Sequence, residues 1–278
     1  MLMNKKTKKT AIAASALLLT GLLVLDSRYN IKITEHELCF DNLPAAFEDF
    51  HIVQLSDLHG ESFGKDNKRL AEIIRGLDPD IIAITGDMAD NVNNIHVFES
   101  LLRGIADVAP IYYVNGNHEW GGRCVEEVKE LLKKYGANNI SNDFEALYLG
   151  GEKIVIAGVD DPMGMADMLK PEEVIAKLRE QYPEEFTLML GHRNYWVEQY
   201  PQLPVDLILS GHAHGGIVRL PLLGGLLSVK HKLFAEYEKG LYEGDEFILS
   251  VSCGLGNSIP VPRFLNRPEI VSIKLRQA

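Results

Sequence analysis

The segment FHIVQLSDLHG (residues 50–60) decides the fold class. Its first part, FHIVQLS (50–56), is apolar and β-prone, which is typical of a buried strand. Asp57 and His59 follow directly. In an extended chain residues i and i+2 point to the same side, so we expect both side chains to face one point beyond the end of the strand. Ligand-type residues in this position are typical of the carboxyl ends of strands in an α/β sheet.

The same pattern continues along the chain. DIIAIT (80–85) and PIYYVN (110–115) are further apolar runs, and helical periodicity marks the segments 67–77, 95–105 and 125–136. Short apolar runs that alternate with helices of this length indicate βαβ units and a largely parallel sheet.

The second half of the chain predicts a second sheet. We expect a hairpin over 146–159 and a helix over 171–182, and strands over 186–190, 205–210 and, antiparallel, 240–254 and 269–275. No repeat and no low-complexity linker interrupts this part of the sequence. With 278 residues the chain is long enough for a substantial core, so residues 28–278 are expected to form one α/β domain with two sheets.

The N-terminal residues 1–27 have the features of a signal sequence. NKKTKK (4–9) is basic, and the segment from Ala11 to Leu25 carries no charge. A cleaved signal peptide, an uncleaved signal anchor and a buried core helix all fit an apolar stretch, which here is shorter than the ~20 residues of a typical span. DSRYN (26–30) is a poor cleavage site, so we favour the anchor. The lysines would then keep the tail in the cytoplasm and place the domain outside the cell membrane, whereas cleavage would give a secreted protein.

Charge and cysteine content narrow the class of partner. The net charge is −11, although four lysines lie within the first ten residues. Such an acidic domain repels a phosphate backbone, so nucleic acid is not an expected partner. Cys39, Cys124 and Cys253 form no CxxC pair and no disulfide framework, and we expect them to be buried small apolar residues.

Each predicted strand is followed by polar residues of a restricted kind. These are carboxylates, histidines and one asparagine, in the segments SDLHG (56–60), TGDMAD (85–90), NGNHE (115–119), LGHRN (190–194) and SGHAHGG (210–216). Carboxylates, an amide oxygen and imidazoles without a thiolate suit Mn²⁺, Fe²⁺ or Zn²⁺. The set is too large for one tetrahedral ion, whereas two divalent metal ions about 3.5–4 Å apart that share a carboxylate would use it all.

The order D-x-H, G-D-x-x-D, G-N-H-E, G-H and G-H-x-H resembles the calcineurin-like metallophosphoesterases, over residues 50–216. The strings GHAHGGIVRLP (211–221), GLGNSIPVPRF (254–264) and RPEI (267–270) are also similar to a small membrane-attached bacterial subgroup of that family. The resemblance implies a four-layer α/β/β/α sandwich of two mixed sheets flanked by helices.

The resemblance also implies a role for each residue of the series. One metal would be held by Asp57, His59, Asp87 and His214, and the other by Asp87, Asn117, His192 and His212, with a bridging hydroxide that attacks phosphorus. His118 would contact the phosphoryl oxygen or protonate the leaving alkoxide. Asp90 would orient His118, would cap the following helix, or both.

Four weaker signals have a functional and a plain structural interpretation. Arg193 either contacts a substrate phosphate or is solvated, and Arg263 either contacts a phosphate or has a structural role. Asp160 and Asp161 either approach the site or belong to a turn. The apolar segment IVRLPLLGGLLSV (217–229) either receives an acyl chain or lipid surface, or packs in the core.

The sequence therefore predicts a dinuclear metal-dependent phosphohydrolase at the cell surface. We expect its substrate to be a phosphodiester or a pyrophosphate, with a lipid-linked one among the candidates. Relatives that cleave a UDP-diacylglucosamine pyrophosphate give one concrete alternative, and a phosphomonoesterase is another. A scaffold without catalysis is the rival class, but here every ligand position of the series and His118 are filled.

Overall fold

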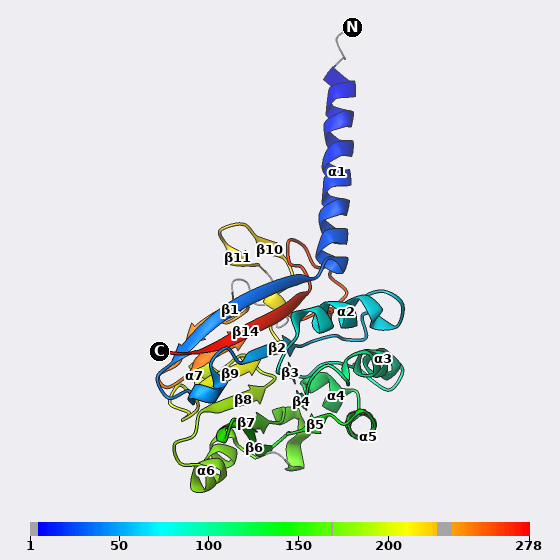
Figure 1. Cartoon of the computed structure of the whole chain (residues 1–278). Helices are drawn as coiled ribbons and strands as arrows, with labels where there is room; N and C mark the ends of the chain where they lie inside the picture. The colour runs from blue at the N-terminus through cyan, green and yellow to red at the C-terminus, as the bar shows by residue number, and fades with distance from the viewer. Residues whose placement is uncertain (1–4, 168, 227–234) are drawn as a thin grey trace.

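The computed structural model describes residues 5–167, 169–226 and 235–278 of the chain. Two six-stranded sheets pack face to face, and helices cover the outer face of each (Figure 1). The order of the first sheet is β1 (Lys32–Phe40), β14 (Glu269–Gln277), β2 (His51–Leu55), β3 (Ile81–Ile84), β4 (Ile111–Tyr113) and β5 (Asn138–Asn139). The order of the second is β12 (Gly240–Glu243), β13 (Ile248–Val251), β9 (Leu207–Ser210), β8 (Thr187–Gly191), β7 (Glu152–Val159) and β6 (Asp143–Leu149).

The helices complete the four-layer α/β/β/α sandwich. The outer face of the first sheet carries α2 (Lys68–Leu77), α3 (Ile95–Ile105) and α5 (Val125–Tyr135), and that of the second carries α6 (Pro171–Gln181) and α7 (Trp196–Gln199). The remaining short elements are α4 (Asn117–Gly121), the 3-10 turns η1 (Ala45–Phe47), η2 (Lys65–Asn67), η3 (Pro162–Asp167) and η4 (His214–Gly216), and the hairpin of β10 (Arg219–Leu220) and β11 (Gly224–Gly225).

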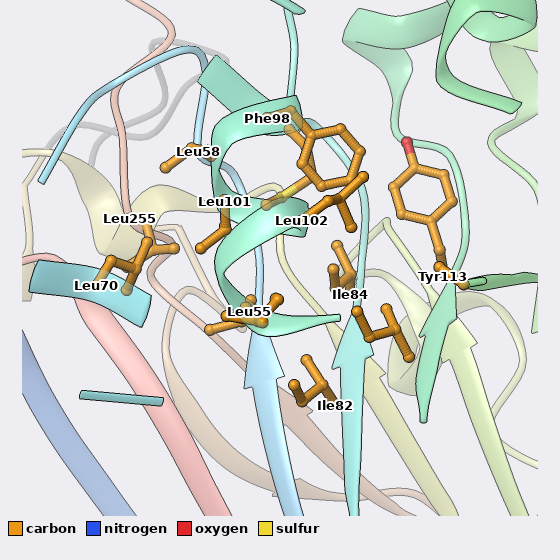
Figure 2. Close-up of a cluster of buried hydrophobic side chains, with 14 of the residues drawn as sticks. Leu55, Leu58, Leu70, Ile82, Ile84, Phe98, Leu101, Leu102, Tyr113 and Leu255 are labelled. Atoms are coloured by element: carbon orange, nitrogen blue, oxygen red, sulfur yellow. The ribbon is translucent and has the colours of Figure 1, made fainter. Parts of the chain in front are cut away.

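Alternate residues of the central strands enter different cores. In β2, Val53 and Leu55 face the helices, whereas Ile52 faces the second sheet. This follows from the period of two in a strand, and it explains why strands that are buried on both faces have continuous apolar sequences. Figure 2 shows Leu101 of α3 over Leu55 of the sheet, and Phe98 of the same helix beside Tyr113. The layers therefore hold the ends of the strands in fixed positions.

Both sheets are mixed, as expected from the family resemblance. The central strands of each are parallel, and antiparallel strands lie nearer the edges. The C-terminal strands were expected to be antiparallel, but this was only half right. Strand β13 pairs antiparallel with β12 and parallel with β9, and β14 pairs antiparallel with β2 and parallel with β1.

Strand β1 is an element that the sequence pattern did not indicate. It is an edge strand and most of its residues are exposed or half-buried, so it lacks the apolar run that marked the other strands. Cys39 lies in it and is exposed, which corrects the expectation for this cysteine, whereas Cys124 and Cys253 are buried as expected.

The N-terminal segment forms one long helix, α1 (Lys5–Tyr29), that projects from the domain (Figure 1). Its part from Ala11 to Tyr29 is long and apolar enough to cross a membrane, with a mean hydropathy of 1.6, and only 6% of that window is buried. It is therefore not a core helix of the domain. By length and composition both a membrane anchor and a signal sequence fit it.

Candidate metal centre

The candidate ligands meet where the carboxyl ends of the strands of both sheets come together. Asp57 and His59 follow β2, and Asp87 follows β3. Asn117 and His118 begin α4 directly after β4, and the remaining three histidines follow the second sheet's strands β8 and β9: His192, His212 and His214. The sheets are joined close to this point, because Gln54 Nε2 donates a hydrogen bond to the carbonyl oxygen of Ser210 at 2.8 Å.

The backbone at five of these residues is left-handed rather than extended. The φ angles are positive at Asp57, His59, Asp87, His212 and His214, between 49° and 67°. Only a few per cent of non-glycine residues adopt this conformation, although Asp and His do so more often than most, and such strain concentrates at functional sites. The side chains therefore converge because the chain turns sharply at each strand end. The expectation that Asp57 and His59 share a side through an extended backbone was wrong in its reason.

Asp57, His59 and His214 form the first cluster, and all three are buried. His59 Nε2 lies 3.1 Å from His214 Nε2, and His214 Nε2 lies 3.4 Å from Asp57 Oδ1. Their ligand atoms are thus close enough to hold one ion.

Asp87, His192 and His212 form the second cluster, which is also buried. His192 Nε2 lies 3.2 Å from Asp87 Oδ2 and 3.2 Å from Asn117 Oδ1. The same Asp87 oxygen lies 3.7 Å from His59 Nε2, in the first cluster. Asp87 is therefore the carboxylate that lies between the two clusters.

The tautomers of His59 and His192 indicate that the ligand atoms of the two clusters suit a bound cation. His192 Nδ1 donates to the carbonyl oxygen of Thr85 at 2.7 Å, and His59 Nδ1 donates to Asp90 Oδ1 at 2.6 Å. When these two rings are neutral, each Nε2 carries a lone pair and is a hydrogen-bond acceptor. It faces carboxylate or amide oxygens, which are also acceptors. Buried acceptors that face one another need a proton or a cation between them. Histidines whose other nitrogen is fixed in this way are typical of metal ligands.

The electrostatics of the centre reflect the same crowding. Burial disfavours the ionised carboxylates, but His214 and His59 keep the pKa of Asp57 well below its usual range, and His192 does the same for Asp87. Burial also disfavours protonated histidines, yet the carboxylates raise the pKa of His59 to about 10 and that of His192 to about 9. Without a metal, protons therefore take the place of cations at these two rings.

His118 lies beside the clusters, at a cavity of about 240 Å³. Its Nδ1 is 2.8 Å from Asp90 Oδ1, and its side chain is 32% exposed. Asp90 therefore contacts His118 as expected from the family resemblance. The alternative that Asp90 caps the next helix was wrong, because α3 begins at Ile95 with Asn94 in the cap position.

Glu119 is a site residue that sequence reasoning missed. Its buried carboxylate accepts hydrogen bonds from four backbone N–H groups, those of Asp87, Met88, Ala89 and Gly116, at 2.6–3.1 Å. It thereby ties the loop after β3 to the loop after β4. Its position beside His118 in GNHE could have indicated this role. A carboxylate that is buried at the end of a strand needs hydrogen-bond donors.

Arg193 lies at the cavity, and the interpretation as a solvated side chain was wrong. Its side chain is only 15% exposed, and Asp161 holds the guanidinium, with Nε–Oδ2 at 2.5 Å and Nη2–Oδ1 at 2.9 Å. Nη1 lies 3.0 Å from His212 Nε2. Asp161 is therefore part of the site's surroundings, whereas Asp160 accepts hydrogen bonds from Trp120 and from Asn115 in the loop after β4.

Arg263 is buried and lies next to the first cluster. Its Nη2 is 3.4 Å from His214 Nδ1, and its Nε donates to the carbonyl oxygen of Gly256 at 2.8 Å. It therefore brings a positive charge close to the metal ligands while it also stabilises the loop before it.

Two glycines allow the carboxylates to approach the backbone. A Cβ at Gly116 would lie 2.2 Å from Asp87 Oδ1, and one at Gly211 would lie 2.3 Å from Asp57 Oδ2. No side chain fits at either position, which is why the motif segments contain glycine there.

The apolar segment 217–229 was expected either to receive an acyl chain or lipid surface or to pack in the core. Neither interpretation describes the whole segment. Ile217 is buried, but Leu222 and Leu223, at the tip of the β10–β11 hairpin, are 105% and 62% exposed. Core packing thus accounts only for the beginning of the segment, and residues 227–229 lie outside the described residues.

Comparisons with known proteins show which family the chain is similar to. The family model for the calcineurin-like phosphoesterases matches residues 50–216. The chain is 32% identical over 253 residues to the uncharacterized metallophosphoesterase YkuE of Bacillus subtilis, which covers 88% of this chain and 86% of that protein. It is 28% identical over 284 residues to a transmembrane protein with metallophosphoesterase domain from Danio rerio, covering 95% of this chain and 62% of that protein. A crystal structure of a dimetal phosphatase from Danio rerio aligns with a TM-score of 0.48 and 11% identity, over 77% of this chain and 90% of that one.

Proposed function

The chain belongs to the calcineurin-like phosphoesterase family and is a hydrolase of phosphoesters, and we propose that it cleaves a phosphodiester or a pyrophosphate with two divalent metal ions. The observation that carries the proposal is the position of Asp87. Its Oδ2 faces the Nε2 atoms of His192 and His59, one in each cluster. A carboxylate between two sets of imidazoles is the arrangement that a dinuclear site requires.

The residues of both clusters would serve as ligands. One ion would be held by Asp57, His59, Asp87 and His214, and the other by Asp87, Asn117, His192 and His212. Oxygen and imidazole donors without a thiolate support Mn, Fe or Zn. When bound, the two ions would lower the pKa of a water between them and stabilise charge on the phosphoryl oxygens.

His118 would supply the proton for the leaving alkoxide. Its Nδ1 is held by Asp90 at 2.8 Å, which leaves Nε2 for the substrate, and the side chain reaches the cavity. A positioned histidine in such a role contributes about 10²–10⁴-fold in rate.

Arg193 would contact the substrate in the same cavity. It lines the same cavity as His118, and its bidentate pairing with Asp161 fixes the guanidinium in one orientation. A guanidinium held in this way is suited to phosphoryl oxygens.

Residues 28–278 would form the catalytic domain, with residues 1–27 as a basic tail and signal anchor. The length and exposure of α1 support an anchor, and the lysines before it support an orientation with the domain outside the cell membrane. The name of the Danio rerio relative, a transmembrane protein with metallophosphoesterase domain, agrees with an anchored form.

The proposal is tested by metal analysis and hydrolysis assays on the wild type and on Asp87→Asn. Purified wild type should bind two divalent ions per chain and, with Mn²⁺, hydrolyse an activated aryl phosphodiester faster than the matching monoester. Asp87→Asn should lose metal and activity together, because both clusters need this carboxylate. Asp66→Asn is the matched control, since Asp66 also has a positive φ but lies away from the clusters. A wild type that binds no metal would overturn the proposal.

A further inference from the structure

A groove of about 340 Å³ lies beside the end of α1. One wall is formed by Val24 and Arg28 of the helix, and the other by the segment 255–263, which includes Pro260, Val261 and Pro262. The wall from the loop is largely apolar, and the charged residues of the lining are Arg28, Glu61 and Arg263. The proposed function assigns no role to this groove.

The groove leads to the candidate metal centre. Ile259 lines both the groove and the cavity that contains His118. Arg263 lines the groove as well, and its Nη2 lies 3.4 Å from His214 Nδ1. A ligand in the groove would therefore have its polar end near a buried cation and the metal ligands, which suits a phosphate group.

The position of Val24 in α1 indicates how deep the groove would lie in a membrane. This residue belongs to the stretch Ala11–Tyr29 that could span a bilayer, one helical turn before Arg28. At 1.5 Å per residue Val24 would lie about 6 Å further into the membrane than Arg28. Because Ile259–Pro262 line the same groove, this loop would lie at the boundary of headgroups and acyl chains, the ~5–10 Å that interfacial segments reach.

Exposed apolar side chains lie on the same side of the domain. Leu265 is 39% exposed close to this loop, and Leu222 and Leu223 are exposed at the tip of the β10–β11 hairpin. Figure 1 shows that this hairpin lies on the side from which α1 projects. Apolar tips gathered on one face of a soluble domain are typical of an interaction surface, here one that would meet the bilayer.

We infer that the groove admits the apolar chain of a membrane lipid, and that the substrate is a lipid phosphoester taken from the bilayer. This inference rests on the proposed function and specifies its substrate class. The acyl chain would remain between Val24 and the loop 259–262, while the phosphoester reaches the metal ligands past Arg263. Water then attacks phosphorus, the lipid or headgroup alkoxide leaves, and His118 supplies its proton, so that a phosphate monoester and an alcohol are formed.

The test uses the full-length protein in phosphatidylcholine vesicles with two probes that share a leaving group. One is a soluble aryl phosphodiester, and the other is a diacylglycerol aryl phosphodiester in the vesicle membrane. Val261→Glu places a charge in the groove. It should lower the rate on the vesicle probe at least tenfold and leave the rate on the soluble probe within twofold of wild type. Pro260→Glu, at an exposed position, should act in the same direction, and its thermal unfolding should match that of wild type.

A control and a second measurement make the result decisive. Leu149→Glu changes an exposed leucine on β6, at the far side of the domain from α1, and should alter neither rate. A photoreactive acyl chain in the vesicles should label the segment 255–263 in wild type and not in Val261→Glu. Unchanged vesicle rates in both groove variants, equal losses on both probes, or labelling confined to α1 would overturn the inference. A wild type inactive on both probes would instead contradict the proposed function.

Discussion

Asp90 shows how a single residue couples the proposed chemistry to the metal ligands. Its Oδ1 accepts hydrogen bonds from His118 Nδ1 at 2.8 Å and from His59 Nδ1 at 2.6 Å. One carboxylate oxygen thus fixes the ring of the proposed proton donor and the ring of a proposed ligand. Changes at His118 and at Asp90 should therefore have different consequences.

We expect His118→Ala to keep its metal and to lose ~10²-fold or more in rate, because the variant lacks the proton donor but retains every ligand. Asp90→Asn should lower both the rate and the metal affinity, since the ring of His59 loses its carboxylate partner. Metal analysis and hydrolysis of an alkyl phosphodiester, whose leaving alkoxide needs the proton, measure the two effects. His96→Ala, at an exposed histidine of α3, is the control. Full activity of His118→Ala would refute the role of His118.

Glu119 should matter for stability rather than for chemistry. In Glu119→Gln an amide NH₂ would face two of the four backbone N–H donors, which would then be buried without an acceptor. At about 1–3 kcal/mol each, this lowers the free energy of unfolding by about 2–6 kcal/mol, measurable by urea denaturation. Glu127→Gln, at an exposed glutamate of α5, should change it little. An unchanged midpoint in Glu119→Gln would contradict the role given to this carboxylate.

Among the elements, α1 is the one that contributes least to the domain. Only its last turn is tied to it: Asp26 pairs with Arg267, Arg28 pairs with Glu61, and Ser27 is buried. The apolar turns before Asp26 are almost fully exposed. The apolar part of the helix therefore contributes little to the stability of the fold.

A fragment of residues 26–278 should fold and, given Mn²⁺, hydrolyse the soluble aryl phosphodiester at the rate of the full chain. A fragment that starts at Lys32 should be less stable, because it lacks both ion pairs and the buried Ser27. Thermal unfolding and the hydrolysis rate of the two fragments check this. An insoluble or inactive 26–278 fragment beside an active full chain would show that α1 is required for the fold.

At the scale of the whole molecule, the centre exists only because two sheets meet. Asp57, His59 and Asp87 come from the first sheet, and His192 and His214 come from the second. Burial between the layers strengthens the interaction of carboxylates and imidazoles. It also means that protons and metal ions compete for the same lone pairs.

This competition predicts opposite pH dependences with and without metal. The carboxylates raise the pKa of His192 to about 9 and that of His59 to about 10, from an ordinary 6.5. In the metal-free protein these pairs contribute stability that is present below about pH 6.5 and is lost as pH rises through 9 and 10. Metal binding displaces the protons, so the affinity for Mn²⁺ should rise about tenfold per pH unit for each proton released.

Calorimetric titration with Mn²⁺ from pH 6 to 8.5, in buffers of different ionisation enthalpy, counts the protons. Urea denaturation of metal-free protein over pH 6.5–10 gives the opposite trend. An affinity for Mn²⁺ that does not change with pH would contradict the exchange of protons for metal at these histidines.

The sequence by itself determined most strands and helices of the two sheets, and it showed that candidate ligands follow the strands. Buried strands, amphipathic helices and the hairpin are encoded by local periodicity, which can be read within a few neighbouring residues. The residues at the strand ends were visible for the same reason, since each follows an apolar run directly. Strand β1 escaped because its pairing with β14 joins residues more than two hundred positions apart, and an exposed edge strand leaves no apolar pattern.

Only the tertiary structure decided how the site is held together. The left-handed backbone at Asp57 and His214, the Nδ1 bonds that fix the tautomers, and the Arg193–Asp161 pair depend on contacts between distant segments. Glu119 is adjacent to His118 in the sequence. The four backbone N–H groups that donate to it come from two loops that meet only after the strands pack. The type of a residue shows which chemistry its side chain can perform. The partners that orient that side chain come from distant segments and reach it only when the layers pack.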